Sequence, residues 1–122
     1  MYPPLFEACA ADSSISGLLS DAGGLRLYPF GEAPQKAPLP SAVWAIGNGE
    51  PENYLGAPPD ADSITTHLDV YGATATEARE VSDALVAVLE ALAHIVSWDG
   101  EGRDEQTRAY RKSFTVDWIV NR

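Results

Sequence analysis

The chain has 122 residues, of which 45% are hydrophobic and 21% are charged. This composition is typical of a folded domain with one hydrophobic core and argues against a disordered chain. The single cysteine, Cys9, excludes an internal disulfide and a site with several thiolate ligands, so we expect no metal and no cofactor. Glycine and proline interrupt the uncharged stretches, which argues against a membrane-spanning helix and a membrane partner.

The formal net charge is −10 at pH 7. A chain this acidic is a poor candidate for wrapping nucleic acid, because Lys and Arg supply most of the affinity for phosphate. Residues 1–102 hold three bases and fifteen acids, whereas residues 103–122 hold five bases and three acids. This asymmetry is consistent with head-to-tail contact between identical subunits, although a basic edge strand would produce the same count.

The N-terminal part of the chain is predicted to be mainly helical. Apolar residues within 4–20 predict one or two short helices, and Asp12 can cap the second of them. A brief strand is predicted over Leu25–Tyr28, and Pro29 follows it without an N–H donor for a ladder. Three prolines hold the predicted loop 31–40 in an extended conformation.

Two strands are predicted in the middle of the chain. The first is Ala42–Ile46, in which Trp44 and Ile46 share one face. The glycine- and proline-rich segment 47–59 is predicted to be irregular. The second strand, Ser63–Gly72, alternates cleanly, and its apolar face consists of Ile64, Thr66, Leu68 and Val70.

The strongest predicted helix spans about residues 74–93. Thr74 and Glu77 have the spacing of a capping box, which satisfies backbone N–H groups at a helix start. Apolar residues then recur at steps of three and four, at Ala78, Val81, Leu85, Val88, Leu89 and Leu92. The stripe is too short for a coiled coil, so we expect a sheet to cover it.

The C-terminal part is predicted as a strand His94–Trp98, a charged turn 99–108 and a long strand Ala109–Val120. Alternation places Phe114 and Trp118 on the face that we expect under the long helix. The element order predicts an α+β fold. It is a mainly antiparallel sheet of about four to five strands, with the long helix and a short N-terminal helix packed on one face.

The residues that could carry chemistry are few. His67 and Asp69 share a strand face, which permits an ion pair, but an exposed or interfacial histidine is favoured over a catalytic one. Cys9 is predicted to be a buried small hydrophobic residue rather than a nucleophile. The acids at 60, 62 and 99–105 are predicted to be solvated turn residues, since they lack the spacing of a calcium loop. We therefore expect no catalytic residues and no enzyme.

Aromatic residues on predicted loops and sheet edges are a more informative feature. Three tryptophans exceed what the core of so small a chain easily hides, and Trp and Tyr are common anchors of protein interfaces. Arg103 and Arg108, in the basic segment 103–122, carry positive charge, whereas residues 1–102 are mainly acidic. The predicted interface residues are Tyr28, Phe30, Trp44, Tyr54, Leu55, Arg103 and Arg108.

Several short motifs are distributed along nearly the whole chain, within residues 1–121. They are LRLYPFG at 25–31, LP at 39–40 leading into VW at 43–44, GEPENYLG at 49–56, LDVYG at 68–72 and YRKSFTVDW at 110–118. Together these motifs resemble the tail-completion family of long-tailed bacteriophages. They are turns and strand faces, so they indicate a family more strongly than a mechanism.

This resemblance implies a tail-terminator or tail-to-head joining protein, formed by a single α+β domain over residues 1–122. Such a subunit forms a homo-oligomeric ring, usually a hexamer, which caps the tail tube protein, stops polymerisation and contacts a head-side connector protein. DNA would pass through the ring without specific binding. The protein would be assembled in the host cytoplasm and would reside in the tail-neck region of the virion.

Two other interpretations remain at this point. The protein could be another neck component, such as an adaptor or a minor tail protein. It could also be a small-ligand-binding α+β domain, which would require a pocket with convergent polar groups. The ring interpretation has support in the loops 29–40 and 47–62, which proline holds open and which could reach a neighbouring subunit.

Overall fold

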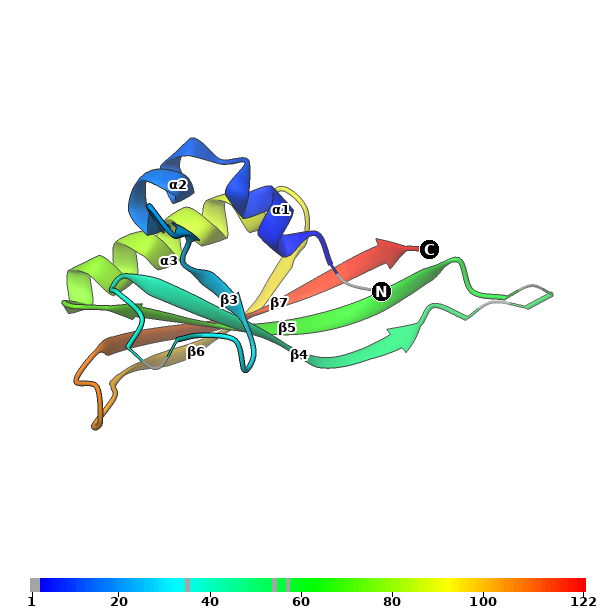
Figure 1. Cartoon of the computed structure of the whole chain (residues 1–122). Coiled ribbons are helices and arrows are strands. Elements are labelled where there is room, and N and C mark those ends of the chain that lie inside the picture. Colours follow the sequence, from blue (N-terminus) through cyan, green and yellow to red (C-terminus); the bar gives the residue numbers. More distant parts are fainter. Residues whose placement is uncertain (1–2, 35, 54, 57) are drawn as a thin grey trace.

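The computed structural model describes residues 3–34, 36–53, 55–56 and 58–122, and it has an α+β arrangement (Figure 1). Its N-terminal elements are α1 (Leu5–Ala10), α2 (Ser13–Leu19), β1 (Ser20–Asp21), β2 (Gly24–Leu25) and β3 (Leu27–Pro29). The longer elements that follow are β4 (Ser41–Pro51), β5 (Ala61–Gly72), α3 (Ala75–Leu89), β6 (His94–Arg103) and β7 (Tyr110–Asn121).

The main sheet has five strands in the order β3-β4-β5-β7-β6, while β1 and β2 form a small separate ribbon. Strand β3 runs parallel to β4, and the other neighbours in the main sheet are antiparallel. The three helices lie on one face of the sheet and leave the other face open (Figure 1). The predicted α+β fold is confirmed, with two short N-terminal helices. Asp12 caps the second of these helices by accepting hydrogen bonds from the N–H groups of Ser14 and Ile15.

The hydrophobic core lies between the sheet and α3. Alternation in β7 places Phe114 and Trp118 on the helix-facing side, where both are buried as predicted. The indole N–H of Trp118 donates to Thr66 Oγ1 at 3.1 Å, so the one polar atom of that ring is satisfied inside the core. The helix contributes its apolar stripe through Val81, Leu85 and Leu89.

Helix α3 begins where the sequence predicts but ends earlier. Thr74 Oγ1 accepts a 3.1 Å hydrogen bond from the Glu77 N–H, and the Glu77 carboxylate accepts one from the Ala73 N–H at 2.9 Å. The last helical residue is Leu89, so Leu92 lies beyond the helix and is 55% exposed instead of extending the buried stripe. Within the described residues, no helix has the length and apolar character needed to cross a membrane.

Two strands are longer than the sequence suggests. Residues 47–51, predicted to be irregular, continue β4 because residues Asn48–Pro51 pair with Asp62–Thr65 after a bulge at Gly47. The absent side chain of Gly47 leaves space for the ring of His67, whose Nε2 would clash with a Cβ at that position. Strand β6 similarly continues past Trp98 to Arg103, with bulges that accommodate its mismatch with β7.

Arg26 organises the N-terminal layer. Its side chain is largely buried, and its guanidinium donates to the carbonyl oxygens of Pro40 (2.7 Å) and Leu18 (3.3 Å). It also forms an ion pair with Asp21 at 2.8 Å, which holds the pKa of that carboxyl below its ordinary value. One cation thus connects the end of α2, the β1 ribbon and the loop that precedes β4.

Candidate interaction surfaces

The open face of the sheet carries hydrogen bonds between neighbouring strands. Asp99 on β6 accepts a 2.5 Å hydrogen bond from the Thr115 hydroxyl and a 2.7 Å bond from the Ser97 hydroxyl. These two bonds, with that of Thr115 the stronger, hold the pKa of the Asp99 carboxyl below its ordinary value. The Nδ1 atom of His67 lies 2.9 Å from Thr115 Oγ1, so the network joins β5, β7 and β6.

The order of these groups determines what they can do. The only hydroxyl proton of Thr115 is directed at Asp99, so the oxygen of Thr115 accepts from His67 and Nδ1 carries the hydrogen. In a catalytic triad, by contrast, the imidazole lies between the carboxylate and the hydroxyl and removes the hydroxyl proton. The network therefore acts as a brace between strands, and it does not activate a nucleophile.

Other acids and the cysteine also have structural surroundings. Asp69 accepts a 2.5 Å hydrogen bond from Ser113, while the ring of His67 is directed at Thr115. Asp62 is not a solvated turn residue, because it lies in β5 and forms an ion pair with Arg122 at 2.9 Å. Burial raises the pKa of the Cys9 thiol to about 12, so the thiol stays protonated at neutral pH.

The predicted turn acid Glu101 is also paired, since it lies in β6 and contacts Arg79 of α3 at 2.8 Å. Across the part of the chain that the structure describes, no three His, Cys, Asp or Glu side chains are grouped in a way that could hold a metal ion. The charged groups of the open face and of the strand ends therefore stabilise contacts between strands and between strand and helix.

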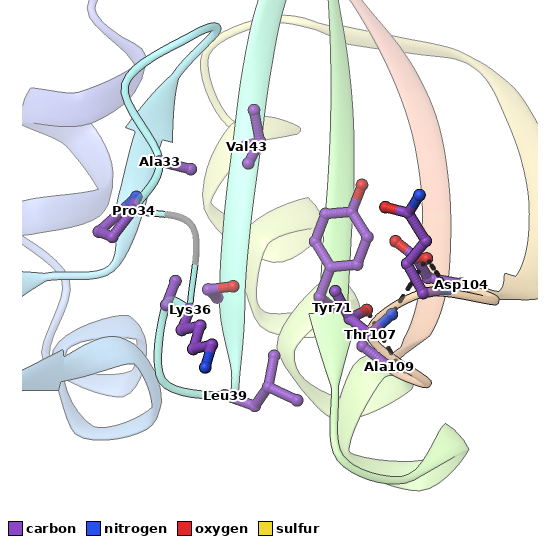
Figure 2. Close-up of a pocket in the computed structure, with 12 residues that line it drawn as sticks. Ala33, Pro34, Lys36, Leu39, Val43, Tyr71, Asp104, Thr107 and Ala109 are labelled. Carbon is purple, nitrogen blue, oxygen red and sulfur yellow. Dashed lines mark hydrogen bonds between the residues drawn. The ribbon is translucent and has the colours of Figure 1, made fainter.

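A groove of about 730 Å³ opens at one end of this face (Figure 2). Its floor is formed by Val43 of β4 and Tyr71 of β5, and its walls are residues 33–34 and 36–39 of the loop before β4 and the turn 104–109 (Figure 2). We call it the Tyr71 groove. Burial raises the pKa of the Tyr71 hydroxyl, with a smaller contribution from the nearby negative charge of Asp69.

The turn wall of the groove is well ordered by its own hydrogen bonds. The Asp104 carboxylate accepts from the N–H groups of Gln106 and Thr107 at 2.9 and 3.4 Å. The backbone N–H of Asp104 donates to the Ala109 carbonyl at 2.8 Å. Because Asp104 is engaged in this way, the wall that it supports is preformed, and mainly apolar and small side chains face the groove.

The other end of the sheet carries a projecting hairpin. Strands β4 and β5 extend past the helical layer there, and the segment that connects them, of which residues 52–53, 55–56 and 58–60 are described, lies at its tip (Figure 1). We call residues 47–60 the arm. Leu55 near its tip is 100% exposed, and the arm contains Glu50, Glu52 and Asp60 but no Lys or Arg. The arm is thus an acidic projection with an exposed leucine.

The predicted interface residues fall in different places. Phe30 and Leu55 are highly exposed, at 80% and 100%, and Tyr28 is half-buried on β3. Trp44 is only 8% exposed and belongs to the core, because it alternates with Val43 and therefore faces the helices. The structure thus removes Trp44 from the surface residues. Tyr54 lies outside the described residues.

The two predicted arginines lie together at the β6–β7 turn. Arg103 stacks on Tyr110, with its guanidinium carbon 4.8 Å from the ring centroid, and its Nε donates to the Arg108 carbonyl at 3.0 Å. Both side chains are exposed, but neither lines the Tyr71 groove. The β6–β7 turn lies at the opposite end of the sheet from the arm (Figure 1).

The groove itself was not predicted from the sequence. Its two walls come from segments about 70 residues apart. The sequence predicts one of them only as a proline-rich loop and the other only as a charged turn. They meet because β7 lies beside β5, which is a pairing that no local pattern specifies. The proline content of the loop was the available signal, since it indicated an extended segment that could form a wall.

Comparisons with known proteins agree with this structural picture. The family model described as "Tail completion protein gp17" matches residues 3–121. No curated protein matches the chain significantly. Among solved structures, a chain from "Virion of native gene transfer agent (GTA) particle" has 16% sequence identity and a TM-score of 0.60. The match covers 97% of this chain and 92% of that chain, and at this identity it shows a shared fold.

The family match extends over almost the entire chain, and it includes the arm, both walls of the groove and the braced open face of the sheet. Tail completion proteins are structural components of phage-like virions and are not enzymes, in agreement with the prediction from the sequence. The resemblance noted from the short motifs is thereby confirmed. We conclude that the chain belongs to the tail completion protein gp17 family.

Proposed function

We propose that the protein forms a ring of six identical subunits that caps the tail tube, terminates tail polymerisation and joins the tail to the head-side connector. Each subunit would contribute one tail-completion domain, residues 1–122. The observation that carries this proposal is the position of two unlike surfaces, the arm and the Tyr71 groove, at opposite ends of one sheet (Figures 1 and 2). Contacts between unlike surfaces are heterologous, and they close into a ring when the rotation between subunits permits it.

The net charge of the chain is compatible with a ring through which DNA passes. The net charge of −10 would repel a DNA duplex, so a bore made of these subunits would let it pass without specific binding. We infer that the ring resides in the tail-neck region of the virion after assembly in the host cytoplasm. Its partners would be further copies of the chain, the tail tube protein and the head-side connector protein, without a membrane partner.

Imaging and mass measurement test the ring directly. The purified protein is measured by light scattering, and purified particles that carry a tagged copy are imaged by electron microscopy. We expect a mass of six subunits and a ring located only where the tail tube meets the neck. A protein that is monomeric in solution and is not found at tail ends would contradict the proposal. Labelling on the head side of the neck would indicate an adaptor, and labelling along the tail would indicate a minor tail protein.

Removal of the protein by an early stop codon tests its role in setting tail length. An early stop codon is introduced into the coding sequence of the virus or particle, and lysates are examined by electron microscopy. We expect tails of uncontrolled length and filled heads that lack tails. Tails of normal length in the absence of the protein would contradict the terminating role. Restoration by the intact chain supplied from a plasmid is the control.

A further inference from the structure

We propose that the tip of the arm of one subunit, with Leu55 at its centre, seats in the Tyr71 groove of the next subunit. This inference rests on the proposed ring and names the two surfaces that hold it together. The occupant of the groove is thus a second copy of this chain.

The surfaces of the tip and the groove are complementary in their apolar character. Leu55 is fully exposed in the isolated subunit, and the neighbouring prolines of the tip also present apolar surface. The groove offers Val43 and the ring of Tyr71 as its floor, with Leu39 at its loop wall (Figure 2). Its volume of about 730 Å³ is ample for a leucine side chain and part of the turn that carries it. Seating the tip there would remove apolar surface of both subunits from water.

The two surfaces are also complementary in charge. The arm contributes the carboxylates of Glu50, Glu52 and Asp60, without a base among its residues. The groove is lined by Lys36, and Arg111 of β7 lies directly opposite Tyr71 of the groove floor in the pairing of β5 with β7. Asp104, the acid that lines the groove, is engaged with backbone N–H groups of its own turn. Charge attraction would therefore orient the acidic arm toward the basic end of the neighbour.

The geometry of one subunit prevents it from filling its own groove. Strand β4 passes from Val43 in the groove floor to Pro51 in the arm, a span of roughly 25 Å for an extended chain. The arm then continues away from the sheet, toward the end opposite the β6–β7 turn (Figure 1). The contact must therefore occur between subunits. Each subunit both offers a tip and receives one, so the contact repeats around a ring.

A matched pair of leucine substitutions tests the role of the tip. Leu55→Ser removes the apolar side chain from the arm, while Leu92→Ser removes another exposed leucine, which follows α3. We expect Leu55→Ser to lower the association constant of the ring at least tenfold, measured by sedimentation, and Leu92→Ser to leave it unchanged. Circular dichroism should show both variants folded. Equal association by Leu55→Ser and the unaltered chain would contradict the inference.

Cysteine cross-linking tests which surfaces meet. Leu55→Cys and Gln106→Cys are combined in one chain, and oxidised samples of purified protein and of purified tail ends are separated without reductant. We expect a ladder of covalent oligomers up to the ring, because Gln106 lies in the turn wall of the groove. The variants with only one of these cysteines should produce no ladder beyond dimers. The native Cys9 is fully buried, so it should not contribute cross-links.

The two proposals can fail separately. Rings that persist in Leu55→Ser, together with no ladder from the double-cysteine chain, would overturn the docking of the tip and leave the ring intact. A chain that is monomeric and not found at tail ends would instead overturn the proposed function. A groove-filling variant, Ala33→Trp, provides a third measurement, since it should weaken association from the receiving side while Leu55 is intact.

Discussion

The hydroxyl of Thr115 donates a 2.5 Å hydrogen bond to the carboxylate of Asp99 on the neighbouring strand. With the bond from Ser97, it places the pKa of Asp99 in the folded protein below the ordinary value of 3.8. A carboxyl group whose pKa is lowered by folding contributes stability above its unfolded pKa and loses it as pH falls through the folded pKa. The contribution of Asp99 should therefore be present at neutral pH and vanish in acid.

We expect Asp99→Asn to lower the free energy of unfolding by about 1 kcal/mol near pH 7, because Asp99 is exposed and solvent weakens its interactions. The difference from the unaltered protein should shrink as pH falls below 3.8 and through the lowered pKa of the folded Asp99 carboxyl. Urea denaturation at several pH values measures it. Asp83→Asn, an exposed position on α3, is the matched control. A difference that is the same at acidic and neutral pH would show that charge is not the cause.

Gly72 ends β5 directly under the first turn of α3. A Cβ at this position would lie 2.6 Å from the Ala78 backbone nitrogen and 3.0 Å from the Thr74 carbonyl oxygen. Because these are backbone atoms, Gly72→Ala must shift the helix, and we expect it to cost about 1–3 kcal/mol of stability. Gly17→Ala in α2 is the control, since nothing lies within 4 Å of its Cβ and alanine favours a helix. Similar unfolding midpoints for the two variants would contradict this prediction.

The buried stripe of α3 can be tested by one charge. Leu85→Asp would place a carboxylate in a position with no solvent exposure, and we expect the subunit to be unfolded or destabilised by more than about 4 kcal/mol. Ala87→Asp, on the exposed side of the same helix, should change stability by less than about 1 kcal/mol. Far-UV circular dichroism and thermal melting compare the two. A folded Leu85→Asp protein would show that the helix faces another way.

Arg26 should be the most important cation for folding. Arg26→Met removes the ion pair to Asp21 and leaves the carbonyl oxygens of Leu18 and Pro40 without this donor. We expect a loss of roughly 2–4 kcal/mol in the free energy of unfolding. Arg79→Met is the control, because its ion pair with Glu101 is exposed to solvent and should contribute much less to stability. Equal losses in the free energy of unfolding of the two variants, measured by chemical denaturation, would contradict the special role of Arg26.

Local patterns predicted most of the elements correctly. The alternation in β5 and β7 and the stripe of α3 were readable because a residue's face follows from strand or helix geometry alone. The extension of β4 through residues 47–51 was missed. Glycine and proline suggested a loop there, whereas pairing with β5 keeps the segment extended. The same applies to β6 beyond Trp98, where bulges allow the ladder to continue.

The sequence alone therefore determined the α+β class, the buried faces and the family, since these depend on periodicity and on short motifs. Tertiary structure decided which aromatic residues are available at the surface. Trp44 is buried because the helices cover its face of β4, whereas Phe30, which directly follows β3, is 80% exposed. Tertiary structure also forms the Tyr71 groove, since residues far apart in the chain become neighbours only when β5 and β7 pair.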